Sequence, residues 1–217
     1  MTVLAFRSSD EWAACVAPVR AHLDHDRVLA YPTETVYGLG SRATEAGVLA
    51  LARVKGRRED KPFLLLVSDR TMAEASGVVF TRAADALARA FWPGPLTLVL
   101  TPVGDRLPPR LRGPEGGIAV RWTSHRGMQY LIGALGAPLT STSANRPGGT
   151  PAPGAAGVTE RFPEAVARGE LLVLDGGVLG NVPPSTVVDC TRPAPALVRE
   201  GAIPRSELRR ATGALVP

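Results

Sequence analysis

Short, nearly continuous apolar runs recur along this chain and constrain its fold more than any other feature. They cover residues 28–31, 63–67, 96–100, 118–120, 139–142, 171–174, 186–188 and 196–198. Each has the length of a β-strand, and most lack the strict alternation of apolar and polar residues that marks a strand with one solvated face. The runs therefore predict a sheet that is covered on both faces.

Helical segments are expected between these runs. The first begins near Ser9 or Asp10 and contains Pro18, which would interrupt or kink it. Thr44 is the expected cap of the second, and further helices are expected at 82–91, 125–135, 158–168 and 205–211. Strands and helices in this alternation predict an α/β fold with a twisted, largely buried mixed sheet flanked by helices.

The composition fits a single domain spanning residues 1–217. A chain of 217 residues with 45% hydrophobic content can bury one core of good size. Its two cysteines are too few for a disulfide framework, and the cysteines and three histidines lack metal-ligand spacing, so we expect no metal site made by protein side chains. No signal pattern and no apolar run of about 18 residues is present, which predicts a cytoplasmic protein that does not cross a membrane.

The lysines stand close together in the sequence. Only two of the 25 lysine and arginine residues are lysines, and both lie in the run from Lys55 to Lys61, with Arg57 and Arg58 between them. Lysine places a compact ammonium group where arginine would place a planar fork. The run predicts a site for a polyanion, either a nucleoside triphosphate or a nucleic-acid backbone, although a solvated charge run at a helix end has the same pattern.

Four polar clusters lie where predicted strands end or begin. They cover residues 31–40, 55–62, 141–145 and 184–186, and Arg199 follows the next predicted strand. Taken singly, each cluster could be a capping or turn segment. Together they would place cations, hydroxyl groups and an amide around one pocket, since open α/β sheets gather ligands at strand ends. Three glycine- and proline-rich stretches, at 102–117, 147–157 and 176–184, are long enough to predict binding loops.

Two familiar nucleotide signatures are excluded or weak. The chain has no Gly-x-x-x-x-Gly-Lys-Ser/Thr run, which excludes a P-loop. Residues 38–43 fit the dinucleotide fingerprint, but they begin six residues after Pro32 and not at the edge of a strand. We therefore interpret that match as a coincidence.

Five ordered motifs together resemble the YrdC-like family, the threonylcarbamoyl-AMP synthases. The motifs are Tyr-Pro-Thr-Glu-Thr-Val-Tyr-Gly-Leu-Gly at 31–40, Lys-Gly-Arg at 55–57, Trp-Pro-Gly-Pro-Leu-Thr at 92–97, Ser-Ala-Asn at 143–145 and Ser-Thr-Val-Val-Asp at 185–189. The resemblance extends over about residues 28–201. It implies the YrdC-like fold with a concave ligand cavity, in the form that has one domain.

The resemblance also implies a reaction. Family members convert L-threonine, bicarbonate and ATP, with Mg²⁺ accompanying the ATP, into L-threonylcarbamoyl-AMP and pyrophosphate. Other proteins then transfer the threonylcarbamoyl group to tRNA. A displacement at the α-phosphate depends on positioning and charge neutralisation. A pocket rich in cations and hydroxyl groups suits that requirement.

Site residues follow from the resemblance, position by position. It implies that the nucleotide half of the site, with Lys55 and Arg57 as the catalytic pair on the phosphates, comprises Lys55, Arg57, Lys61, Ser143, Asn145 and Arg199. It implies that threonine is held by Thr33, Arg121, Ser141 and Ser185. A guanidinium group suits a carboxylate because it offers two parallel hydrogen bonds.

Two departures and two alternatives accompany this interpretation. Arg58 stands where many relatives have proline, and Leu66 stands where some have a histidine near the threonine. One alternative is a module that binds double-stranded RNA or tRNA without chemistry, and weak RNA binding would also be compatible with the enzyme. The other is a carbamoyl-transfer relative with a different substrate.

Overall fold

The computed structural model describes residues 2–56 and 62–213. Within these ranges eleven strands form one mixed sheet, with β5 attached to β6 beside the main order β1-β9-β2-β3-β8-β4-β7-β6-β10-β11. The strands are β1 (Val3–Ala5), β2 (Val28–Tyr31), β3 (Gly38–Gly40), β4 (Leu64–Val67), β5 (Val78–Val79), β6 (Leu96–Pro102), β7 (Ile118–Trp122), β8 (Leu139–Ser143), β9 (Leu171–Asp175), β10 (Thr186–Asp189) and β11 (Ala196–Arg199).

The centre of the sheet is antiparallel where the polar segments meet. Strand β3 pairs antiparallel with β2 and with β8, and β8 pairs antiparallel with β4. Strand β7 runs parallel to β4 and antiparallel to β6, which in turn runs parallel to β10. The predicted mixed sheet is therefore confirmed.

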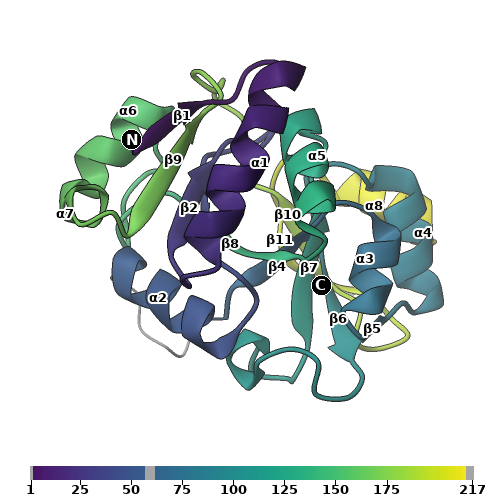
Figure 1. Cartoon of the computed structure of the whole chain (residues 1–217). Coiled ribbons are helices and arrows are strands. Elements are labelled where there is room, and N and C mark those ends of the chain that lie inside the picture. The colour runs from purple at the N-terminus through teal and green to yellow at the C-terminus, as the bar shows by residue number, and fades with distance from the viewer. Residues whose placement is uncertain (1, 57–61, 214–217) are drawn as a thin grey trace.

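Helices cover the two faces unequally. They are α1 (Ser9–Leu23), α2 (Glu45–Lys55), α3 (Arg70–Ala75), α4 (Arg82–Phe91), α5 (Arg126–Leu135), α6 (Ala155–Arg161), α7 (Pro163–Ala167) and α8 (Arg205–Thr212), with a 3₁₀ turn at Pro109–Leu111. Helices α1 and α5 pack against each other on one face, whereas α2, α4, α6, α7 and α8 contribute to the core on the other (Figure 1).

Side-chain direction along the strands explains the two core layers. Leu29 and Tyr31 of β2 and Leu66 of β4 point to the layer under α1 and α5. Their neighbours Ala30 and Leu65 point to the opposite layer. Because side chains alternate along a strand, an apolar run fills both layers at once. This is the burial that the sequence runs predicted.

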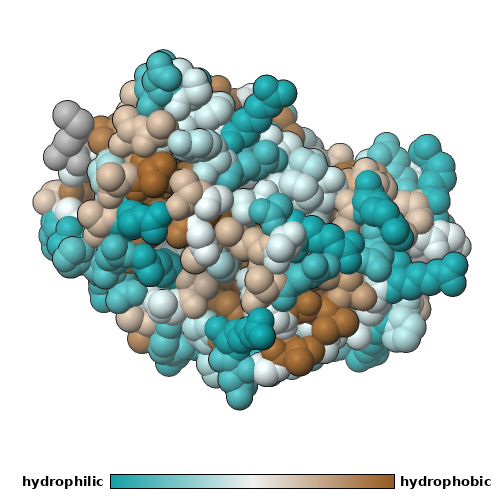
Figure 2. All heavy atoms as spheres, turned by 45° about the vertical axis from the view of Figure 1, so that its right-hand side comes forward, coloured by the Kyte–Doolittle hydropathy of each residue, from teal (hydrophilic) through white to brown (hydrophobic). Residues whose placement is uncertain are grey.

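Exposed apolar side chains are scattered. Val79, Val103 and Val198 are among the exposed apolar residues. On the side that carries α4 and α8, hydrophilic residues separate small apolar patches (Figure 2). Such single exposed residues are normal for a folded domain. None of the helices in residues 2–56 and 62–213 is both long and apolar enough to cross a membrane.

All eight predicted strands are present, with ends that differ by a few residues at most. Three strands (β1, β3 and β5) and the short helix α3 were not predicted. Strand β3 was not predicted because it consists of two glycines and a leucine. A Cβ on Gly38 would lie 2.9 Å from the Tyr31 ring, and one on Gly40 would overlap the Thr140 carbonyl oxygen. Glycine is required here by the close approach of neighbouring strands, and residues 38–43 do not form a dinucleotide loop.

Three helix predictions need correction. Ser8, not Ser9 or Asp10, caps α1, through a capping box with Glu11. Helix α1 continues through Pro18 to Leu23, because proline removes one backbone hydrogen bond while the apolar stripe on both sides of it stays buried. The helix expected at 158–168 is two helices, α6 and α7, divided at Phe162, since the residue before a proline disfavours the helical conformation.

Candidate functional site

A cavity of about 470 Å³ opens over the middle of the sheet. Its walls come from neighbouring strands β3, β8, β4, β7, β6, β10 and β11 and from the loops that follow β2 and β8. On β7 the lining residues Ala119 and Arg121 are two positions apart, and Val120 between them belongs to the core layer on the other face. This period of two means that the cavity lies on one face of the sheet.

The cavity occupies the part of that face that α1 and α5 leave open. Leu64 of β4 lines the cavity, while Leu66, two residues further along the same strand, is buried in the core layer under the two helices. The polar clusters therefore meet on the face of the sheet and not only at strand ends. The clusters do meet around one pocket, as expected, but the pocket extends over the sheet face beyond the strand ends.

Most of the residues predicted for the site come together here. Those that line the cavity are Thr33, Arg121, Ser141, Ser143, Asn145, Ser185 and Arg199. Lys55 does not line it but contacts two residues that do. The predictions for Arg57 and Lys61, and the departure at Arg58, lie outside the described residues.

Lys55 is the last residue of α2 and is buried, with only 4% of its surface exposed. Its Nζ donates to the Ser143 carbonyl oxygen and, at 2.9 Å, to Asn145 Oδ1. Asn145 Oδ1 also accepts from Ser143 Oγ at 2.5 Å. Buried ammonium groups need such partners. Lys55 is thus fixed beside the cavity wall, and Asn145 connects it to the loop after β8.

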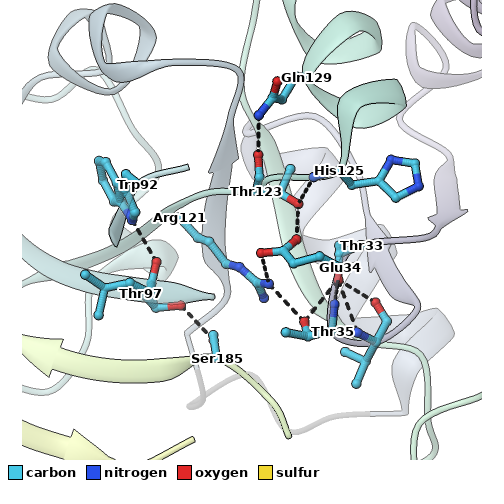
Figure 3. A network of polar contacts seen from close by, with 12 residues as sticks. Thr33, Glu34, Thr35, Trp92, Thr97, Arg121, Thr123, His125, Gln129 and Ser185 are labelled. Atoms are coloured by element: carbon cyan, nitrogen blue, oxygen red, sulfur yellow. Dashed lines mark hydrogen bonds and ion pairs between the residues drawn. The ribbon is translucent and has the colours of Figure 1, made fainter. Parts of the chain in front are cut away.

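A second group of polar side chains lies on the opposite wall. Arg199 Nη2 donates to the Ser185 carbonyl oxygen at 2.8 Å, and Ser185 Oγ lies 2.9 Å from Thr97 Oγ1 (Figure 3). Burial lowers the pKa of Arg199, and the positive charge of Arg121 lowers it further. Two guanidinium groups that repel each other across one cavity favour an anionic ligand between them.

Thr33 organises the loop between β2 and β3. Its Oγ1 accepts from the backbone N–H groups of Thr35 and Val36, each at 3.2 Å, and donates to the Val36 carbonyl oxygen at 2.7 Å. A hydroxyl group that bonds its own backbone in this way closes a tight turn. The turn directs Glu34 towards Arg121.

Arg121 is paired inside the protein, which the sequence did not indicate. Its Nη2 donates to Glu34 Oε1 at 2.8 Å and to Thr35 Oγ1 at 2.9 Å, and Thr123 Oγ1 donates to Glu34 Oε2 (Figure 3). Sequence reasoning missed Glu34, Thr35, Thr97 and Thr123. The only available signal was that three of them stand within quoted motifs.

The pair controls the ionisation of Glu34. Burial alone would raise the pKa of this carboxyl group, but the charge of Arg121 and hydrogen bonds from Thr123 and Arg121 outweigh burial, so the pKa lies below its usual value. Burial lowers the pKa of nearby His125, although Glu34 partly offsets the effect. A lowered pKa favours the neutral imidazole, which agrees with the role of His125 as the N-cap of α5. In that role its Nδ1 accepts from the Met128 N–H at 3.3 Å.

We expect Glu34→Gln to lower stability in a pH-dependent way. The folded-state pKa is depressed, so the charge of Glu34 stabilises the fold above the unfolded pKa of about 4.3, and this contribution is lost as pH falls through the folded value. Near neutral pH, a loss of about 1–2 kcal/mol would lower the melting temperature by roughly 2–8 °C. Thermal unfolding of both proteins from pH 8 to pH 3 should show curves that converge below about pH 4. A difference that stayed constant over the whole range would show that the charge of Glu34 does not contribute.

The glycine- and proline-rich stretches contribute unequally. Gly149 and Pro151 from stretch 147–157 and Pro184 from stretch 176–184 line the cavity. No residue of stretch 102–117 is among the described lining residues of this cavity, so its role as a binding loop stays a prediction.

The lining determines what chemistry is available. Among the described lining residues there is no histidine, cysteine, aspartate or glutamate, and the polar ones are two arginines, one asparagine and six serine or threonine residues. Within residues 2–56 and 62–213, no group of three or more histidine, cysteine, aspartate or glutamate side chains could hold a metal ion. The cavity can bind and orient anions, and it suits reactions that depend on position and charge neutralisation.

The fold and this cavity define an α/β protein with an arginine- and hydroxyl-bearing cavity on the open face of a mixed sheet. The model of the Sua5, YciO and YrdC family, described as telomere recombination, matches residues 21–201. The chain belongs to this family, which confirms the resemblance drawn from its motifs.

Two relatives and one solved structure show how similar this chain is to other family members. A threonylcarbamoyl-AMP synthase of Pyrococcus abyssi is 33% identical over 94% of this chain, which spans 58% of that protein. One of Chromohalobacter salexigens is 40% identical over 82% of the chain and 94% of its own length. A crystal structure of P. abyssi Sua5 complexed with L-threonine superposes with a TM-score of 0.87 at 29% identity, covering 100% of this chain and 62% of that one.

Proposed function

We propose that this chain synthesises L-threonylcarbamoyl-AMP from L-threonine, bicarbonate and ATP and releases pyrophosphate. The single observation that carries the proposal is the cavity, which places Arg121, Arg199 and a set of hydroxyl groups on one open sheet face. The names of the synthase relatives and the threonine bound to P. abyssi Sua5 support it.

The chemistry follows from the groups present. The threonine amine and bicarbonate form a carbamate with loss of water, and a carbamate oxygen attacks the α-phosphate of ATP. The bond from that phosphorus to the bridging oxygen breaks, and pyrophosphate leaves. Mg²⁺ bound to the triphosphate would share in neutralising the charge of the leaving group, while protein cations hold its oxygens. No described lining residue has to act as nucleophile.

We assign the two substrates to different sets of lining residues. Threonine would lie against Thr33, Arg121, Ser141 and Ser185, with its carboxylate on the guanidinium group of Arg121. ATP would lie towards Ser143, Asn145 and Arg199, with Lys55 and Arg57 on its phosphates and Lys61 close by. The product would then pass to proteins that transfer the threonylcarbamoyl group to tRNA.

Pyrophosphate release tests the proposal. Release should require ATP, threonine and bicarbonate together, and omission of any one should reduce it to background. Release that depends on threonine but not on bicarbonate would indicate an aminoacyl adenylate. No release in any combination would refute the proposed activity.

Lys55→Ala should weaken ATP binding about tenfold to a hundredfold, which corresponds to roughly 1.5–3 kcal/mol of charge-assisted hydrogen bonding. The substitution removes the ammonium group and also frees the Ser143–Asn145 segment that it holds. Calorimetric titration with ATP and Mg²⁺ measures the change.

Arg53→Ala is the matched control, because Arg53 lies in the same last turn of α2 and is exposed. We expect its ATP affinity to equal that of the wild type. Unchanged affinity in the Lys55 variant would remove Lys55 from the nucleotide site.

A further inference from the structure

The interaction between Glu34 and Arg121 is more enclosed than the other ion pairs described. The side chains are 20% and 6% exposed, and their atoms lie 2.8 Å apart. The pair between Glu115 and Arg192 has nearly the same length, 2.9 Å, but its side chains are 63% and 75% exposed. Only the enclosed pair can hold a guanidinium group in one orientation, because exposed pairs contribute about 0–1 kcal/mol.

The carboxylate of Glu34 is itself fixed at both oxygens. Oε1 accepts from Arg121, and Oε2 accepts from the hydroxyl group of Thr123. Thr123 is anchored in turn, since its Oγ1 accepts from the His125 N–H at 3.2 Å and its carbonyl oxygen accepts from Gln129 Nε2 at 2.8 Å (Figure 3). Glu34 therefore connects Arg121 to the start of helix α5.

The hydrogen bonds to Glu34 and Thr35 leave some N–H donors of Arg121 without a partner in the described part of the protein. A guanidinium group has five N–H donors. Nη2 serves Glu34 and Thr35, whereas Nε is buried and has no hydrogen-bond partner among the described residues. Nη1 has no acceptor in the described part of the chain either, and Arg121 lines the cavity. Of these two groups only Nη1 is available to a ligand, because Nε is buried.

We propose that Glu34 is a positioning residue that holds Arg121 with its unused Nη1 group available to the substrate carboxylate in the cavity. The proposal rests on the proposed function for the identity of that substrate, an α-amino acid. Glu34 does not line the cavity and acts through Arg121. Its effect should fall on the amino-acid half of the site and spare the nucleotide half.

The first experiment examines the guanidinium group without substrate. Nitrogen-15 NMR of the ligand-free protein should show an arginine side-chain signal with hindered rotation, assigned to Arg121 by its loss in Arg121→Lys. Glu34→Ala should abolish the hindrance, and Glu115→Ala should leave it unchanged. Hindrance that persists in Glu34→Ala would overturn the proposal, whether or not the chain has the proposed activity.

The second experiment separates the two substrates. We expect Glu34→Ala to raise the KM for threonine about tenfold to a hundredfold, because truncating one partner of an enclosed pair leaves the other poorly held. Glu34→Gln keeps the shape of the side chain and one of its hydrogen bonds. It should raise the KM for threonine by only about threefold to tenfold. The KM for ATP should stay within about twofold in both variants, since the positioned group serves only the amino-acid half. Glu115→Ala should leave both KM values unchanged.

A double variant tests whether Glu34 acts through Arg121. Once Arg121 is lysine, Glu34→Ala should raise the KM for threonine far less than it does in the wild type. Equal increases in both backgrounds, or parallel increases for ATP and threonine, would show that Glu34 has a general structural role. Absence of turnover in the wild type would refute the proposed function, and the NMR result would then decide the role of Glu34 alone.

Discussion

An Arg121→Lys variant should bind threonine about tenfold to a hundredfold more weakly than the wild type while binding ATP nearly as well. Arg121 uses Nη2 for Glu34 and Thr35, which would leave Nη1 for the ligand. Lysine has a single ammonium group that cannot hold Glu34 and a substrate carboxylate in the same geometry. Separate calorimetric titrations with threonine and with ATP measure the two affinities.

Arg192→Lys controls for the conservative change itself. Arg192 pairs with Glu115 at 2.9 Å on the surface, so neither affinity should change. If Arg121→Lys weakened the binding of ATP and of threonine equally, or changed neither affinity, the division of the cavity into an amino-acid half and a nucleotide half would be wrong.

Gly40→Ala should cause a large loss of stability. The new Cβ would overlap the Thr140 carbonyl oxygen and lie 2.9 Å from the Tyr31 hydroxyl oxygen. The backbone cannot yield without separating β3 from its neighbours in the centre of the sheet. We expect a loss of about 3 kcal/mol or more, at the upper end for overpacked cores, measured as a lower midpoint of urea unfolding.

Gly180→Ala is the matched control, because a Cβ there meets nothing within 4 Å. Its unfolding midpoint should stay close to that of the wild type, within about 0.5 kcal/mol. A Gly40→Ala protein as stable as the control would show that the β3–β8 pairing, which aligns Gly38 with Ser143, tolerates the displacement.

The fold could be predicted from the sequence where burial dictated the residue type. A run such as 171–174 must be apolar at every position because β9 packs on both faces, and the run alone indicates this. Strand β3 could not be predicted in this way, since Gly38 and Gly40 reflect the approach of Tyr31 and the Thr140 backbone from other strands. Pro18 shows the same limit, because tertiary packing of α1 outweighed a local helix-breaking signal.

The site could be predicted only in part. The family resemblance assigned Ser143, Asn145 and Arg199 to one site, but no spacing rule indicated how their side chains meet. Lys55 and Asn145 are 90 positions apart, and Glu34 and Arg121 are 87 apart. Such contacts depend on the order of strands in the sheet. An acid–arginine pair of this separation has no local signature, so Glu34 was overlooked although it stands within a quoted motif.

The central claim is that the cavity joins threonine, bicarbonate and the adenylyl group of ATP in one product. The most direct measurement is mass spectrometry of the nucleotide formed from ATP, Mg²⁺, threonine and ¹³C-bicarbonate. We predict an adenylate that contains threonine and the labelled carbon, formed with pyrophosphate and reduced strongly in Arg121→Lys at low threonine. An adenylate that contains threonine without the label, or no adenylate at all, would contradict this account.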